Sequence, residues 1–183
     1  MNNQPTGRRH AGFTAIELLT TAAVLCILLT LGIPVFKAAI QNNRMSAARN
    51  SITTHLNLAR SEAVKRGIGM VLCPSISGSS CRSSTIWSNG FMLFVDSNGS
   101  RQYEPGEQIL RYIDPGSANI RISSSTGRRK VVYNQYGFAS GYNLTFTFCE
   151  VNNLVEPRAV IVSSSGRARL SATAANGDPL NCS

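Results

Sequence analysis

The sequence predicts an α+β protein in which a long N-terminal α-helix packs on an antiparallel β-sheet domain. The first third of the chain carries an apolar run, followed by apolar residues at helical spacing. After Gly67 the chain changes to short apolar segments that are separated by turns rich in Gly, Asn and Pro, a pattern typical of antiparallel strands. The 183 residues suit one domain with an N-terminal appendage.

The first part of the predicted helix is apolar enough to cross a membrane. Residues 13–33 match a hydrocarbon core about 30 Å thick. Arg8 and Arg9 precede this run, so the positive-inside rule keeps them in the cytoplasm and places the bulk of the chain outside. Glu17 interrupts the run, and a carboxylate there costs about 2.5–3.5 kcal/mol unless it is paired. We interpret Glu17 as functional; the alternative is an acidic residue that reaches the membrane surface.

The helix is expected to continue as an amphipathic segment and to end near residue 66. Apolar residues recur at intervals of three to five positions, as on one helical face: Ile40, Met45, Ala48, Ile52, Leu56, Ala59 and Ala63. Basic residues fall mostly between them. Lys65 and Arg66 in the last turn, with Gly67 after them, form a helix stop signal.

The rest of the chain is expected to form short antiparallel strands. The predicted segments are 68–75, 90–96, 107–114, 118–123, 130–134, 144–150, 158–164 and 167–171. The last segment, "RARLS", pairs back on its predecessor after the turn at Ser165-Gly166. The sheet then packs on the amphipathic part of the helix.

The start of the apolar run resembles the class III signal of type IV pilins. "GFTAIELL" has, in order, a glycine after a basic leader, a phenylalanine, a threonine and a glutamate, with Ala15 where leucine is commoner. The resemblance implies that a prepilin peptidase cuts after Gly12 and that Phe13 becomes the methylated N-terminus. It also implies that Glu17 pairs with the N-terminal ammonium group of a neighbouring subunit during assembly.

The pilin resemblance divides the chain into three parts. Residues 1–12 are a cleaved leader, residues 13–36 a transmembrane and filament-core helix, and residues 37–183 a periplasmic or extracellular domain that includes the amphipathic half of the helix. The implied partners are other pilin subunits, the prepilin peptidase and, as a single-pass protein before assembly, the inner membrane. Cleavage changes the net charge from +9 to +7, with 16 basic and 9 acidic residues remaining, which favours anionic partners.

Segments from most of the chain resemble the FimT/GspH branch of the pilins. They are "LARSEAVKRG", "VLCPS", "GFMLFVDSNG" and "SSSGRARLS". This branch contains minor pilins of type IV pili and H-type pseudopilins of type II secretion, between which the sequence discriminates poorly. Pilins of the FimT type that take up DNA carry a Gly-Arg-x-Arg motif near the C-terminus, and Gly166-Arg167-Ala168-Arg169 matches it.

Two basic clusters form the candidate DNA site. Strand alternation places Arg167 and Arg169 on one face, about 6.5–7 Å apart, where both guanidinium groups can bind phosphates. Gly166 would let a nucleic-acid backbone approach closely. The second cluster is Arg128, Arg129 and Lys130, of which only one arginine is expected to share the patch with the first. The alternative is a solvated edge strand whose charges prevent aggregation.

We therefore expect a minor pilin that binds double-stranded DNA through its backbone, without sequence preference, for uptake in natural transformation. The alternative is a structural or priming minor pilin, or an H-type pseudopilin, without DNA binding. A basic anchored protein that contacts anionic membrane or cell-wall polymer would need neither the cleavage signal nor Glu17. No catalytic set occurs, so we expect neither an enzyme nor a cofactor. The acidic residues between Asp96 and Glu107 lack EF-hand spacing, which favours a polar turn over a calcium site.

Five cysteines remain after cleavage. Cys26 lies in the apolar helix and is interpreted as a small hydrophobic residue. In an oxidising periplasm the other four allow three pairings, of which we predict Cys73–Cys81 and Cys149–Cys182. The second bond would hold the C-terminal tail beside the arginine hairpin.

Overall fold

The computed structural model describes residues 14–114 and 119–182. The chain forms two compact units, Met1–Ala39 and Ile40–Ser183. Helix α1 spans Ala15–Arg66, so its first part belongs to the first unit and its second part to the second. The helix end agrees with the stop signal at Lys65, Arg66 and Gly67.

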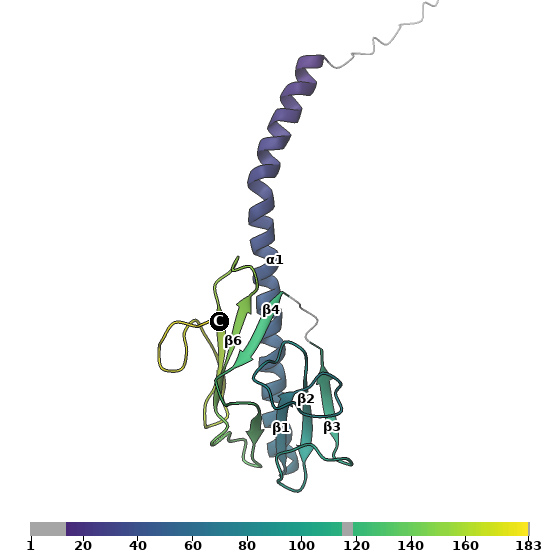
Figure 1. Ribbon diagram of the computed structural model, residues 1–183, viewed down its shortest axis with the longest axis vertical. Helices are drawn as coiled ribbons and strands as arrows, with labels where there is room; N and C mark the ends of the chain where they lie inside the picture. The colour runs from purple at the N-terminus through teal and green to yellow at the C-terminus, as the bar shows by residue number, and fades with distance from the viewer. Residues whose placement is uncertain (1–13, 115–118, 183) are drawn as a thin grey trace, which may run out of the picture. The chain divides into compact units, whose positions relative to one another are not determined.

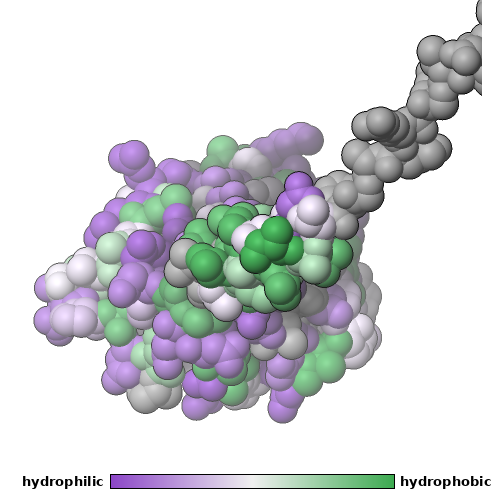
Figure 2. Space-filling model, turned by 90° about the horizontal axis from the view of Figure 1, so that it is seen from above, coloured by the Kyte–Doolittle hydropathy of each residue, from purple (hydrophilic) through white to green (hydrophobic). Residues whose placement is uncertain are grey.

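In the first unit α1 is exposed and strongly apolar, and apolar side chains gather around the helix where it is seen end-on (Figure 2). The exposed large side chains are Ile16, Leu18, Leu19, Val24, Leu25, Ile27, Leu28, Leu29, Ile33, Val35 and Phe36. Among the described residues α1 is long and apolar enough to cross a membrane, which fits a single-pass anchor.

Glu17 lies in the first turn of α1 and closes its N-terminal end. Its Oε2 accepts hydrogen bonds from the backbone N–H and the hydroxyl of Thr14, both at 2.8 Å. A carboxylate at this position satisfies backbone donors that have no partner within the helix. Gly12 and Phe13, the expected cleavage site and mature N-terminus, lie outside the described residues.

The described residues of the second unit form eight strands, each overlapping a predicted segment. They are β1 (Gly69–Pro74), β2 (Phe91–Asp96), β3 (Ile109–Ile113), β4 (Ile120–Ser124), β5 (Val131–Tyr133), β6 (Leu144–Glu150), β7 (Arg158–Val162) and β8 (Ala168–Ser171). The predicted antiparallel pairing is confirmed, but the strands form two sheets (Figure 1). The first sheet has the order β3-β2-β1-β5 and the second β4-β6-β7-β8.

The inner faces of both sheets pack on one face of α1. The buried apolar residues of the helix are among those predicted from spacing: Met45, Ala48, Ile52, Leu56, Ala59 and Ala63. Ile40 was predicted to belong to this face and does not, because its side chain is 41% exposed while its neighbour Gln41 is 8% exposed. Alternate strand residues such as Leu93 in the first sheet and Phe146 in the second complete the core.

Trp87 connects the two sheets inside the core. Its ring packs edge-to-face with the Phe146 ring, with 4.8 Å between the ring centres, and its indole N–H donates to Ser124 Oγ at 3.0 Å. The Trp87 backbone N–H donates to the Ile122 carbonyl at 2.8 Å, so the loop before β2 is hydrogen-bonded to β4. The buried indole therefore has its polar group satisfied while its ring fills the space between the sheets.

The outer face of the first sheet carries a second apolar cluster. It consists of Val71, Cys73, Met92, Phe94 and Val132, against which Cys81, Tyr103, Ile109 and Tyr142 pack. The Cys73–Cys81 disulfide, one of the two predicted, fastens the loop after β1 over this face.

The C-terminal tail returns to the outer face of the second sheet. Phe146 and Phe148 point into the core, so Cys149 points outward, and it forms the other predicted disulfide with Cys182. Arg121, opposite Cys149 on β4, donates from Nη1 to the Cys182 carbonyl at 3.3 Å. Each disulfide therefore fastens one segment of the chain over the outer face of one sheet.

Loss of the Cys149–Cys182 bond is expected to destabilise the fold more than loss of Cys73–Cys81. The bonds close sequence separations of 33 and 8 residues. The chain-entropy model then gives about 4 and about 2.5 kcal/mol of stabilisation through the unfolded state. Urea unfolding of the two Cys→Ala double variants in detergent, followed by Trp87 fluorescence, measures both. Equal losses, or the reverse order, would contradict this expectation.

Candidate nucleic-acid interface

The predicted arginine hairpin is formed by β7 and β8. Arg169 lies opposite Ile161 in the antiparallel register, whereas Arg167 precedes β8 and belongs to the turn. The Ser163 N–H donates to the Arg167 carbonyl at 3.0 Å, and the Arg167 N–H donates to Ser163 Oγ at 3.3 Å. The serine thus closes the turn, and both arginine side chains are exposed.

Gly166 is buried in this turn and serves the packing of the chain itself. Its φ is +79°, and a Cβ at this position would lie 2.0 Å from the Gly137 carbonyl oxygen. The Ala139 N–H donates to the Ser164 carbonyl at 2.9 Å, which ties the turn to the segment after β5. We expected Gly166 to admit a nucleic-acid backbone, but the backbone that approaches it is the chain's own. The Tyr133 ring also packs against Gly166, and the burial of this side chain raises the pKa of its phenol group.

Arg169 and Arg128 line one cavity of about 410 Å³ at the outer face of the second sheet. We call this cavity the hairpin groove. Its other polar lining residues include Ser125, Thr126, Asn143, Ser163 and Ser164. Arg167 is exposed in the turn of the hairpin but does not line the cavity. One residue of each predicted cluster, Arg128 and Arg169, therefore lines the same groove. Arg167 and Arg169, by contrast, do not lie on one strand.

A second cavity, of about 500 Å³, is lined by five cationic side chains, and we call it the basic groove. They are Arg82, Arg101, Arg128, Arg129 and Lys130, accompanied by Tyr103 and Tyr142. Sequence reasoning missed Arg82 and Arg101, because neither stands in a run of basic residues. Their positions in the sequence were the available signal: Arg82 follows Cys81, and Arg101 lies in the loop between β2 and β3.

The segment between β4 and β5 explains why Arg128 lines both cavities. β4 is an edge strand of the second sheet and β5 of the first, so the connecting residues 125–130 cross from one sheet to the other. The Arg128 N–H donates to the Ser125 carbonyl at 2.9 Å, and its Nη1 donates to the Gly141 carbonyl. These bonds fix Arg128 at the boundary of the two grooves.

The acidic residues of the loop between β2 and β3 bind the loop's own donors. The Arg101 N–H donates to both Asp96 carboxylate oxygens at 3.2 Å. The carboxylate of Glu107 accepts from the N–H groups of Ser97 and Glu104, both at 3.1 Å. Arg101 takes a φ of +62°, which is uncommon for a residue other than glycine. The closed loop thereby holds Arg101 beside the basic groove.

Three comparisons relate the chain to known proteins. The family described as Type II transport protein GspH matches residues 48–166. The Pilin-like protein PilA1 of Thermus thermophilus is 30% identical over 166 residues, which cover 87% of this chain and 97% of that protein. The type IV minor pilin FimU of Pseudomonas aeruginosa has a similar fold, with a TM-score of 0.58 and 19% identity over 75% of this chain and 96% of FimU.

Replacing Gly166 by alanine is expected to destabilise the second unit by about 2–5 kcal/mol. A left-handed conformation costs a residue with a Cβ about 1–2 kcal/mol, and the overlap with the Gly137 carbonyl costs about 1–3 kcal/mol more. Gly177→Ala is the matched control, since Gly177 has a φ of +92° and open space around it. Urea unfolding followed by Trp87 fluorescence compares them, and equal losses would refute the packing role.

Proposed function

Because the chain belongs to the GspH family of type IV minor pilins and pseudopilins, we propose that it is a minor pilin that binds DNA through its arginine hairpin for uptake in natural transformation. The family consists of structural subunits rather than enzymes. One observation carries the proposal: Arg128 and Arg169, from distant parts of the chain, line one groove with serine and threonine hydroxyls. None of the described residues that line this groove is acidic.

The hairpin groove has the chemistry of a phosphate-backbone site. Guanidinium groups bind phosphate oxygens with two parallel hydrogen bonds, and hydroxyl groups donate further ones. Arg167 is exposed in the same turn, where its backbone is hydrogen-bonded to the groove residue Ser163, and we expect it to add a third cation. Contacts of this kind are largely independent of sequence and weaken steeply with salt. That suits the capture of DNA of any sequence.

The N-terminal part of the chain supports a proposed order of processing, membrane anchoring and assembly. Prepilin peptidase removes residues 1–12 and the new N-terminal Phe13 is methylated, after which residues 13–36 anchor the subunit in the inner membrane. Residues 37–183 then face the periplasm. On assembly into a pilus, Glu17 exchanges its bond to Thr14 for the N-terminal ammonium group of a neighbouring subunit, where a low dielectric strengthens the pair.

The double variant Arg167→Ala/Arg169→Ala is expected to lower duplex affinity at least about tenfold. The slope of log K against log salt is negative, and each lost phosphate contact reduces its magnitude by about 0.9. Two lost contacts therefore reduce the magnitude by about 1.8. Fluorescence anisotropy of a labelled mixed-sequence duplex, titrated with the full chain in detergent at several salt concentrations, measures both quantities. Unchanged affinity and slope would remove the hairpin from the DNA site.

The matched control is Arg44→Ala/Arg111→Ala, which removes the same charge elsewhere. Both side chains are exposed. Arg111 lies opposite Leu93, whose side chain points into the core, so Arg111 faces away from the outer-face cluster. A wild-type chain without salt-sensitive duplex binding would favour a structural or priming minor pilin, or an H-type pseudopilin.

A further inference from the structure

We propose that the basic groove is a second phosphate-binding site and that one DNA backbone runs from the hairpin groove, past Arg128, into it. The proposal rests on DNA being the ligand of the hairpin groove and extends its footprint to Arg82, Arg101, Arg129 and Lys130. Arg82 and Arg101 belong to neither of the basic clusters apparent in the sequence.

The cations of the basic groove keep their charge available for a ligand. The partners of their side chains are neutral: Arg129 Nη1 donates to Ser83 Oγ at 2.7 Å, Arg101 Nη1 to the Tyr142 hydroxyl at 3.0 Å, and Lys130 Nζ to the Arg101 carbonyl. Arg66 differs, because its Nε donates to Glu62 at 2.6 Å. Hydroxyl and carbonyl partners hold the groove side chains in place without cancelling their charge.

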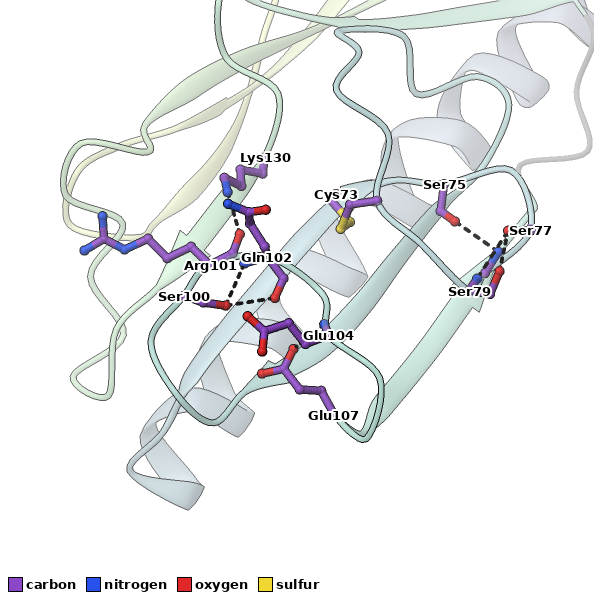
Figure 3. Close-up of a disulfide and its surroundings, with 12 residues drawn as sticks. Cys73, Ser75, Ser77, Ser79, Ser100, Arg101, Gln102, Glu104, Glu107 and Lys130 are labelled. Atoms are coloured by element: carbon purple, nitrogen blue, oxygen red, sulfur yellow. Dashed lines mark hydrogen bonds between the residues drawn. A yellow bond between two sulfur atoms is a disulfide. The ribbon is translucent and has the colours of Figure 1, made fainter.

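Carboxylates are kept out of the groove. None of the described residues that line it is acidic. Glu104 directly follows the groove residue Tyr103, and Glu107 lies further along the loop that carries Ser100 and Arg101 (Figure 3). The Asp96 carboxylate accepts the backbone N–H of Arg101 and does not line the groove. Glu104 accepts from the Asn98 amide at 3.0 Å, and Glu107 accepts from backbone N–H groups of the loop. An anion entering the groove therefore meets cations and hydroxyl groups.

The walls of the groove are held rigidly. The Cys73–Cys81 disulfide and the Arg82 N–H, which donates to the Pro74 carbonyl at 2.7 Å, fix the backbone at Arg82. Tyr103 packs edge-on against Phe94 at 5.4 Å, and the guanidinium group of Arg101 lies 5.5 Å from the centre of the Tyr142 ring. Because these side chains are already ordered, a bound phosphate loses less affinity to the cost of immobilising them.

Arg128 makes the two grooves continuous. Its side chain lines both cavities, and the residues around it cross between the two sheets. A backbone held by Arg169 at one side of Arg128 meets Arg129 and Lys130 at the other. A duplex presents phosphates at regular short intervals along each strand, so a row of cations of this kind engages several of them at once.

The double variant Arg82→Ala/Arg129→Ala tests the proposal in the duplex titration described above. We expect the slope of log K against log salt to shrink in magnitude by about 1.8, because two phosphate contacts are lost. The affinity for the duplex is expected to fall at least about tenfold. The control Arg44→Ala/Arg111→Ala is expected to change each of them less. A pair of Arg→Gln changes at Arg82 and Arg129, which keeps a donor for Ser83, is expected to give the same loss with the wild-type unfolding midpoint.

The outcomes separate this proposal from the function on which it rests. If Arg82→Ala/Arg129→Ala matches the control while Arg167→Ala/Arg169→Ala loses affinity, the basic groove is refuted and the hairpin stands. The reverse result refutes the hairpin and leaves the basic groove as the binding site. Titration above the dissociation constant is expected to give one duplex per chain. Two duplexes per chain would overturn the single continuous backbone.

Discussion

The folded domain depends on one contact surface, the apolar face of α1 between Met45 and Ala63. Three of its buried positions are alanines, which let the inner faces of both sheets approach the helix closely. Since this face occupies the inner side of each sheet, the outer sides need another cover. The chain provides it with the disulfide-bonded loop after β1 on the first sheet and the disulfide-bonded tail on the second.

The grooves result from this arrangement. Short loops and a tail cannot cover a twisted sheet completely, and hollows remain at their margins, lined by polar side chains. The basic groove lies where the loops over the first sheet meet the connection from β4 to β5, and the hairpin groove lies where that connection meets β7 and the tail. Arg128 belongs to both because the connection is the place where the chain changes sheets.

Local patterns in the sequence predicted the helix, its end, the strand segments and the two cysteine pairs, and the resemblance to the FimT/GspH branch was confirmed. Ile40 was assigned to the buried face because periodicity cannot tell where the sheets stop covering the helix. The division into two sheets depends on pairing between distant strands. Arg82 and Arg101 were missed because only the tertiary fold brings them beside residues 128–130, and the reason for Gly166 lies in Gly137, far from it in sequence.

Both groove walls also depend on when the chain is oxidised. A newly made chain in a reducing cytosol keeps its thiols free, so the loop that carries Arg82 and the tail that covers the second sheet have no covalent fastening. The row of cations then lacks its fixed spacing, although the charges are present. Oxidation after export would then act as a maturation step that fastens the loop and the tail beside the two grooves.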